Sequence, residues 1–419
     1  MDTCTASEHY RTRALLRTFP DEGTAVEAAL SLCNSDSTVL PSSANWPSSR
    51  LSIAPMLEVT DRHFRYMMRL LSRRCKLYTE MLVDQTLMYN MKPYEAQEFF
   101  LGHSDIEHPL AVQLGGNDPE TLGMAAKACE EWGGYDEINL NCGCPSPKVS
   151  ERCFGARLML DPQRVRRIVA EMGRQVCRTE VTVKCRLGAD DRDTYPELCE
   201  FVEACKQGGV RHVVLHARKC LLNGLSAAQN RTVPPLQYEV VHQLCRDFPE
   251  MTFSLNGGVM SLSQCLSHIQ PTFGVGEASD RDESFCDGSA SGLPHCHGVM
   301  LGRAAWHTPW SLRNVDSAVF GDKRGDPMAG KSRRDLCEEY LEYAEGIAAK
   351  YGDHKGGGNY GWAPSIMLRP LMGLFHGERG GKGFKTRLCG DLRDKSKSLA
   401  ELLDDALTEV PLYVLDATA

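Results

Sequence analysis

The residue in this sequence with the clearest chemical potential is a cysteine at the end of a short apolar segment. Residues 135–146 read Tyr-Asp-Glu-Ile-Asn-Leu-Asn-Cys-Gly-Cys-Pro-Ser, so alternating apolar residues run into a Gly-Cys-Pro turn. Pro145 and Pro147 predict a loop there rather than a core strand. A thiol held on a stiff loop at the carboxyl end of a strand can donate a proton or act as a nucleophile, which makes Cys144 a candidate catalytic residue. The alternative is a small buried hydrophobe.

Polar residues also lie near the ends of the other apolar segments. Taken singly, each of them is as often a hydrogen-bonded structural residue as a ligand. Their recurrence along the chain favours a polar pocket where the segment ends converge. They are Glu80, Gln113, Asn141, Lys184, His216, Arg218, Asn256 and Arg303. The glycines at 257–258 and 302 add unobstructed backbone N–H groups in the loops that commonly bind phosphate in barrels, so we predict a phosphorylated cofactor.

These residues need a scaffold, and the sequence supplies strand-like and helix-like segments in alternation. The strand-like runs are 51–57, 77–82, 110–115, 137–141, 181–187, 212–217, 252–258 and 297–303. Helix-compatible stretches between them include 61–72, 119–132, 162–172, 196–206, 236–246 and 261–268. Eight alternations in about 250 residues are typical of an α/β fold of the (β/α)8 TIM-barrel type. A doubly wound open sheet is the competing architecture, and it is disfavoured because no Gly-x-Gly-x-x-Gly turn follows the first strand.

The sequence divides into three parts. We expect residues 1–48 to be a poorly ordered extension and residues 49–328 to be the barrel. An insertion at 272–294 falls on the face opposite the site by barrel connectivity. Residues 329–419 carry helical patterns at 333–351 and 396–407 without strands, which predicts a smaller all-helical domain. Near the insertion, Cys286, His295, Cys296 and His297 match no strong zinc spacing, so no metal is predicted.

Composition places the chain among globular intracellular proteins. Of 419 residues, 42% are hydrophobic and 24% charged, and no run approaches the roughly 20 apolar residues that span a bilayer. The 18 cysteines lie mostly within periodic segments, which predicts reduced thiols. We therefore expect a cytoplasmic protein that does not associate with membranes, and the N-terminal extension leaves an organelle open. Nothing in the sequence indicates an obligate protein partner.

Charge is unevenly distributed along the chain. The formal net charge is −8, which argues against general nucleic-acid binding. Between residues 366 and 397, however, eight basic residues stand against three acidic ones, so this stretch has a net charge of +5. The basic residues are Arg369, Arg379, Lys382, Lys385, Arg387, Arg393, Lys395 and Lys397. Such a stretch is often a solvated helix face, and here it is also a candidate surface for following a phosphate backbone.

At this point the motifs resemble those of a known family, the tRNA-dihydrouridine synthases, and most closely its DusA branch. The resemblance runs from about residue 51 through 321 and continues more weakly into the helical tail. Its motifs are Ala-Pro-Met-Leu at 54–57, Tyr-Thr-Glu-Met at 78–81, Gln-Leu-Gly-Gly at 113–116, Asn-x-Gly-Cys-Pro-Ser at 141–146, Val-Lys at 183–184, His-Ala-Arg-Lys at 216–219, Asn-Arg at 230–231, Asn-Gly-Gly at 256–258 and Gly-Arg at 302–303. Cys142, two residues before Cys144, duplicates the thiol.

The resemblance implies an FMN enzyme, reduced by NADPH, that converts uridine to 5,6-dihydrouridine in the D-loop of tRNA at positions 20 and 20a. By family match, Cys144 is the catalytic acid. The expected FMN-binding residues are Pro55, Met56, Gln113, Lys184, His216, Asn256, Gly258, Gly302 and Arg303. The residues expected to face tRNA are Asn141, Arg218, Lys219, Asn230 and Arg231, with the helical domain holding the tRNA body.

Two other functions remain open at this stage. An FMN barrel acting on a small pyrimidine, similar to a dihydroorotate dehydrogenase, explains the cofactor site equally well but leaves the basic tail without a use. A non-catalytic tRNA-binding factor explains the tail and predicts that Cys144 is dispensable.

Overall fold

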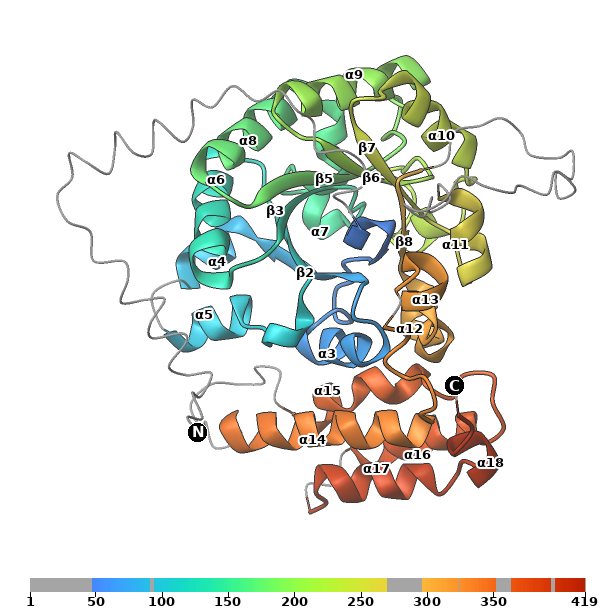
Figure 1. Cartoon of the computed structure of the whole chain (residues 1–419). Helices are drawn as coiled ribbons and strands as arrows, with labels where there is room; N and C mark the ends of the chain where they lie inside the picture. Colours follow the sequence, from blue (N-terminus) through green and yellow to red (C-terminus); the bar gives the residue numbers. More distant parts are fainter. Residues whose placement is uncertain are drawn as a thin grey trace, which may run out of the picture. The chain divides into compact units, whose positions relative to one another are not determined.

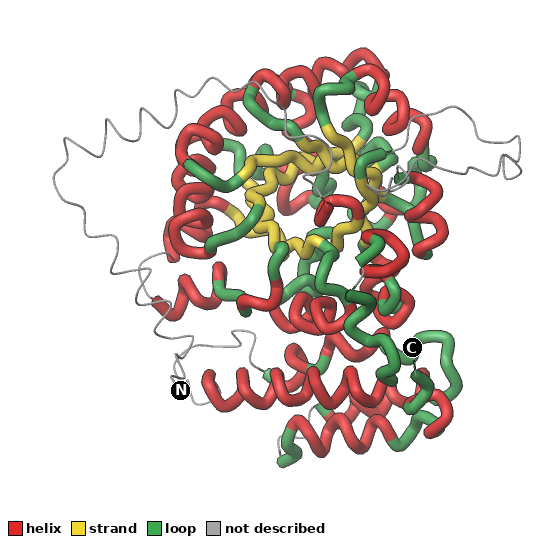
Figure 2. The backbone as a smooth tube through the Cα atoms, viewed as in Figure 1, coloured by secondary structure: helices red, strands yellow, loops and turns green. Residues whose placement is uncertain are grey.

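The structure, a computed structural model, describes residues 47–90, 94–269, 296–322, 324–351, 363–392 and 396–418, all within one compact unit that spans 43–419. Eight parallel strands close into a barrel in sequence order, with helices around it (Figures 1 and 2). The strands are β1 (Leu51–Ile53), β2 (Lys76–Val83), β3 (Leu110–Gly115), β4 (Glu137–Cys142), β5 (Glu180–Arg186), β6 (His212–His216), β7 (Thr252–Asn256) and β8 (Gly298–Leu301). The predicted TIM barrel is confirmed.

The β1 strand is shorter than predicted, because the chain turns soon after Ile53. Pro55 has no N–H for a strand ladder. The carbonyl of Met56 then accepts the N–H groups of Val59 and Thr60 at 3.0 and 2.9 Å, which closes a turn instead of extending the strand.

Helices surround the barrel, between successive strands and after β8. They are α3 (Arg62–Leu71), α4 (Asp84–Asn90), α5 (Tyr94–Leu101), α6 (Pro119–Ala128), α7 (Pro147–Ser150), α8 (Pro162–Gln175), α9 (Tyr195–Gln207), α10 (Tyr238–Asp247), α11 (Leu262–His268), α12 (Arg303–His307) and α13 (Val315–Phe320). Asp118 and Asp161, each before a proline, cap α6 and α8 by accepting backbone N–H groups three residues on. The short helices α4 and α5 were not predicted, because each is too short to show a clear apolar period.

The C-terminal region is helical and packs onto the barrel through α3. It contains α14 (Arg333–Tyr351), α15 (Pro364–Met367), α16 (Gly381–Asp391), α17 (Leu399–Leu407) and α18 (Leu412–Leu415). The ring of Tyr343 on α14 stacks on Tyr66 of α3 with centroids 3.7 Å apart. Arg369 forms an ion pair of 2.7 Å with Asp61, the residue that caps α3. Buried side chains of both regions belong to one hydrophobic core.

Some predictions concern residues outside the described parts. The proposed extension at 1–48 falls there except for its last two residues, and so does the insertion at 272–294. Within the described residues, the cysteines form no disulfide. No described helix combines the length and apolar character needed to cross a membrane.

The amino-terminal end of the barrel interior is polar. The carboxylate of Glu137 on β4 receives Lys76 Nζ at 2.6 Å, Tyr78 Oη at 2.6 Å and Thr182 Oγ1 at 2.5 Å. Lys76 and Tyr78 reach from β2 past β3 to β4, so these side chains cross the barrel interior. Glu180 is the register partner of Glu137 on β5. Burial and the neighbouring Glu137 carboxylate raise the pKa of Glu180 to about 8.

This raised pKa makes folding stability depend on pH. From about pH 5 to pH 8 the folded chain retains a proton on Glu180 that the unfolded chain has lost, so stability falls as pH rises through this window. Glu180→Gln removes this pH dependence. Between about pH 5 and pH 8, the free energy of unfolding of the variant should therefore rise by on the order of 2 kcal/mol relative to that of the parent. Thermal unfolding at a series of pH values measures this change, with Glu171→Gln on α8 as the control, because Arg174 holds the pKa of Glu171 well below this pH window. A constant difference between Glu180→Gln and the parent would contradict the assignment.

Candidate active site

The predicted pocket residues occupy one face of each strand, at its carboxyl end. On β3, Leu110, Val112 and Leu114 belong to the core outside the barrel, whereas Gln113 lies on the opposite, inward face. The same alternation turns Asn141, Lys184, His216 and Asn256 inward on the following strands. Lys184 Nζ on β5 donates to Asn256 Oδ1 on β7 at 3.1 Å, a bond that passes β6 on the inner side. The carboxyl end of the barrel is therefore lined with polar groups.

A chain of hydrogen bonds connects the barrel interior to the loop that carries Cys144. Asn139 Nδ2 donates to Thr182 Oγ1 at 2.8 Å, and Gln113 Nε2 donates to Asn139 Oδ1 at 2.8 Å. Asn141 Nδ2 then donates to Gln113 Oε1 at 2.7 Å. Thr182 itself donates to Glu137, so the chain is continuous with the buried charges below. A fully satisfied network of this kind fixes its members in one geometry.

The end of this network positions Cys144. Asn141 Oδ1 accepts the backbone N–H groups of Gly143 at 3.1 Å and of Cys144 at 2.9 Å. The Cys144 carbonyl accepts the N–H of Ala156 at 2.9 Å. Backbone bonds thus hold the loop on both sides, while the thiol itself is half-buried and remains accessible. Cys142 is fully buried on the outward face of β4, so the two thiols are not equivalent.

Arg186 holds the same loop from the other side, and the sequence analysis missed it. Its Nε donates to the Gly143 carbonyl at 2.9 Å, and its Nη1 donates to the carbonyls of Asn230 at 2.9 Å and Lys219 at 3.3 Å. The guanidinium therefore connects the loops after β4 and β6. The signal was present in the alternation of β5, because Arg186 is the next inward position after Lys184.

We expect Arg186→Lys to lower turnover by about 10-fold or more while substrate affinity changes less. Lysine keeps the charge but lacks the planar fork that serves three carbonyls at once, so the Cys144 loop should lose its fixed position. Separate measurements of kcat and KM test this, with Arg178→Lys on an exposed loop as the control. Reduced thermal stability with unchanged kcat would show that Arg186 is structural only.

The site carries a surplus of positive charge. In the described residues no ion pair joins Lys184, Arg186, Arg218 or Arg303 to a carboxylate. Burial, with Arg186 close by, lowers the pKa of Lys184 to about 8. Burial and these same four cations lower the pKa of His216 well below its ordinary value, so its imidazole is neutral. The site is therefore prepared for an anionic ligand.

Arg218 and the glycines after β7 also favour the binding of an anionic ligand. Arg218 is buried and donates to the Pro234 carbonyl, but its Nε has no hydrogen-bond partner. Gly257 and Gly258 have φ values of +108° and +73°. A Cβ atom on Gly257 would lie 2.5 Å from Cδ2 of His216, so only glycine lets the ring occupy its place. The Gly257 carbonyl accepts the hydroxyl of Tyr238 at 2.7 Å.

The remaining predicted cofactor residues lie on the loops after β1 and β8. Pro55 and Met56 follow β1, and the Met56 side chain packs on a small apolar cluster inside the barrel. A Cβ atom added to Gly302 would lie 3.6 Å from Met56 Sδ, so these two loops are adjacent. Arg303 begins α12 and is exposed. Glu80 on β2 was also predicted to lie at the rim. Its carboxylate accepts the backbone N–H of Glu58 and so connects β2 to the loop after β1.

The residues expected to face tRNA fall into two groups. Arg231 is exposed, and Lys219 is partly exposed in an ion pair with Asp193. Asn230, in contrast, is fully buried and bonds through both ends of its amide to the backbone of Leu221, so its contact with tRNA stays a prediction. Its side chain organises the loop that carries Arg231. Asn141 is likewise buried and holds the Cys144 loop.

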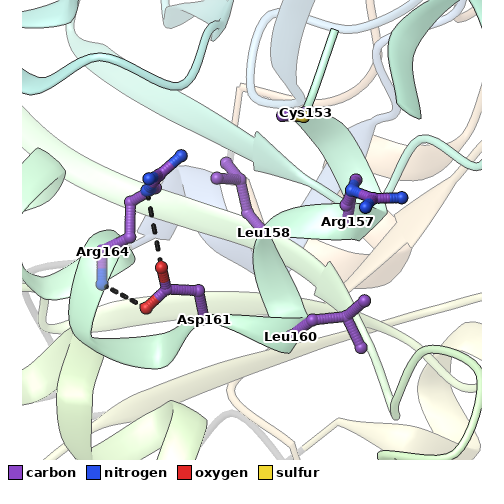
Figure 3. Close-up of a pocket in the computed structure, with 6 residues that line it drawn as sticks. All are labelled: Cys153, Arg157, Leu158, Leu160, Asp161 and Arg164. Carbon is purple, nitrogen blue, oxygen red and sulfur yellow. Dashed lines mark hydrogen bonds and ion pairs between the residues drawn. The ribbon is translucent and has the colours of Figure 1, made fainter. Parts of the chain in front are cut away.

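A cavity of about 210 Å³ lies along the chain between Cys153 and the first turn of α8 (Figure 3). It is lined by Cys153, Arg157, Leu158, Leu160, Asp161 and Arg164. Arg164 pairs with Asp161, the α8 cap, at 3.5 Å. None of the predicted site residues lines this cavity, so it is separate from the polar rim.

The closed barrel and its polar, cationic carboxyl rim define the class of this protein, a TIM barrel of the kind that carries an enzymatic site at that end. The comparisons then identify the family. The dihydrouridine synthase (Dus) family model matches residues 52–276. This chain therefore belongs to the dihydrouridine synthase family, as its motifs predicted.

Curated relatives match this chain over nearly their whole length. A protein from Escherichia coli named tRNA-dihydrouridine(20/20a) synthase is 44% identical over 365 residues, which is 86% of this chain and 96% of that protein. Proteins of the same name from Vibrio parahaemolyticus and Pseudomonas putida are each 39% identical, over 87% and 84% of this chain and 98% and 92% of theirs. The predicted likeness to the DusA branch is confirmed.

Proposed function

We propose that this protein reduces uridine to 5,6-dihydrouridine in the D-loop of tRNA, at positions 20 and 20a, with FMN as cofactor and NADPH as reductant. The observation that carries the proposal is the accessible Cys144 thiol, held by Asn141 and Arg186 next to a group of cations that form no ion pair within the described parts of the chain. The names of the relatives support the substrate and the two positions.

The residues present fit FMN. Its phosphate requires positive charge and unobstructed N–H groups, which Arg303, the orphaned Nε of Arg218 and the glycine loop after β7 provide. Lys184, Gln113 and Asn256 would bind the polar edge of the ring, and Met56 its apolar face. The proposed FMN site also includes Gly258, Gly302, Pro55 and the neutral imidazole of His216. Bound FMN, once reduced by NADPH, supplies the hydride that adds to C6 of the uracil.

Cys144 then supplies the proton that completes the reaction. Hydride addition at C6 places negative charge on C5 and on the O4 oxygen, and the thiol transfers its proton to C5. The remaining thiolate forms near Lys184 and Arg186, whose positive charges stabilise it. Because Asn141 and Arg186 hold the loop at its backbone, the sulfur can lose its proton without a change in loop position.

Binding of tRNA must compensate for extracting a base from the folded RNA, which costs a few kcal/mol. In our proposal Arg231 and Lys219, at the rim of the barrel, provide part of this binding free energy. The helical region provides the remainder through α16 and the turn before it. Arg379, Lys382 and Lys385 are exposed there, and in the part that the structure describes no ion pair engages them. Arg369, Arg387 and Lys397 are engaged in ion pairs, and Arg393 and Lys395 lie outside the described residues.

The alternative of a small pyrimidine substrate can be separated from this proposal by coupled NADPH oxidation. Under anaerobic conditions, the purified yellow protein should consume NADPH continuously when unmodified tRNA transcript is added. Free uridine, uracil or orotate should give no turnover beyond a single reduction of the bound flavin. Continuous turnover with a small pyrimidine, and none with the transcript, would contradict the proposed function.

A further inference from the structure

Two cysteines and several histidines lie together at the amino-terminal end of the barrel, opposite Cys144. Cys245 stands in the last turn of α10, and Cys296 lies just before β8. Their Sγ atoms are 4.0 Å apart. The Cys296 sulfur also lies 3.9 Å from Nδ1 of His242. His297 accepts the N–H of Phe253 at 3.2 Å, which fixes its ring beside Cys245.

The two thiols have different surroundings. Cys245 is partly exposed, whereas Cys296 is fully buried. The hydrogen bond from the Cys296 thiol, reinforced by His297 and His242, lowers the pKa of Cys245 to about 6. Cys245 is therefore the more acidic of the two thiols, and it lies within contact of the Cys296 sulfur. Buried cysteines elsewhere behave in the opposite way, since burial raises the pKa of Cys142 and Cys185.

We propose that Cys245 and Cys296 are a peroxide-sensitive thiol pair that closes to a disulfide. The Cys245 thiolate attacks one oxygen of hydrogen peroxide, the O–O bond breaks, and hydroxide leaves while the sulfur becomes a sulfenic acid. Cys296 gives its proton to His242, and its sulfur displaces the hydroxyl group of the sulfenic acid, which leaves as water once that proton reaches it. The two sulfurs together lose two electrons, and one peroxide becomes water and hydroxide; the hydroxide takes up the proton that Cys245 released when it ionised.

Metal binding is the main competing use of such a cluster. A zinc site needs at least three ligands that converge on one point. Among the described residues, no group of three or more His, Cys, Asp or Glu side chains is placed to hold a metal ion. The geometry therefore favours reversible oxidation of the two thiols over metal binding.

The position of the pair predicts what oxidation changes. A bond between residues 51 positions apart would join α10 to β8 and close a loop that contains β7 and α11. Cross-linking a loop of this size restricts the unfolded chain, and we expect Tm to rise by about 5 °C. The catalytic rim lies at the other end of the barrel, so turnover should stay within about 2-fold of the reduced protein. The inference therefore stands independently of the proposed function.

The full-length protein, reduced and freed of reductant, can be treated with one equivalent of hydrogen peroxide, alkylated and mapped by tandem mass spectrometry. The expected result is a Cys245–Cys296 cross-link before any other cysteine is modified. Cys296→Ser should instead trap Cys245 as a sulfenic acid that reacts with dimedone. Cys245→Ser should leave Cys296 reduced. Both replacements are nearly isosteric, and unchanged circular dichroism would confirm that each variant folds.

The Cys142 and Cys185 thiols provide the matched control. These residues are register partners on β4 and β5, both fully buried, and they should remain reduced throughout. Oxidation of the exposed Cys153 or Cys177 ahead of Cys245 would overturn the proposal. So would one equivalent of zinc in the purified protein that protects Cys245 until a chelator is added.

Discussion

Cys144→Ala is expected to lower the rate of dihydrouridine formation by about 10²- to 10⁴-fold, the range typical for loss of a positioned general acid. The loop should keep its shape, because Asn141 and Ala156 bind its backbone and not its sulfur. Flavin content and tRNA affinity should therefore match those of the parent. Single-turnover reduction of tRNA by the reduced enzyme measures the effect without interference from the NADPH step.

Cys142→Ala is the matched control for this variant. Cys142 is two residues away but fully buried in the core outside the barrel. Its loss should lower thermal stability and leave the single-turnover rate within a few-fold of the parent. If Cys144→Ala retained full activity and Cys142→Ala lost it, the assignment of the acid would be reversed. If both variants remained fully active, a non-catalytic role for the loop would be favoured.

Reversing the three exposed charges of the helical region, in the combined variant Arg379→Glu, Lys382→Glu and Lys385→Glu, should raise KM for tRNA by about 100-fold. Each side chain that contacts a phosphate contributes to affinity and to its salt dependence, so the salt slope should fall by about 2 to 3. At saturating tRNA, kcat should be unchanged, because none of the three residues belongs to the Cys144 loop or to the proposed FMN site. Filter binding at several salt concentrations, together with steady-state kinetics, tests the prediction.

A control with equal charge change is available on the barrel, where Arg166, Arg167 and Arg178 are exposed on and after α8. Their reversal to glutamate should leave KM within about 3-fold. Equal losses in the two triple variants would indicate general electrostatic attraction and remove the specific role of α16. Deleting the region after Gly330 is a poorer test, because buried side chains of α14, such as Tyr340, share one core with Phe64 of α3.

The barrel could be predicted because its strands are short, apolar and separated by helices with strong start signals. Alternation within each strand then placed Gln113, Lys184 and Asn256 on the inward face together. The helix α16 could not be predicted, because it contains three glycines, which usually disfavour helices. In the structure, Gly383 packs so closely on Glu409 that a Cβ would lie 2.7 Å from its carboxylate, so packing overrides propensity.

Side-chain roles were harder to predict than positions. Asn230 stands in a motif beside exposed Arg231, and only the folded loop shows that its amide bonds to the backbone of Leu221. Arg186 was missed for the opposite reason. A charged residue at the end of a strand is ordinary in sequence, and its importance comes from three carbonyls contributed by distant loops. The alternation of β5 places Arg186 on the inward face, but the three carbonyls that it binds depend on tertiary structure.

The most direct test of the account is to incubate the purified protein with unmodified tRNA transcript and NADPH, digest the RNA and measure its nucleosides by mass spectrometry. The account predicts uridine with two added hydrogens, located in the D-loop at positions 20 and 20a and absent when NADPH is omitted. A yellow protein that NADPH reduces, but that leaves every uridine of the transcript unchanged, would contradict it.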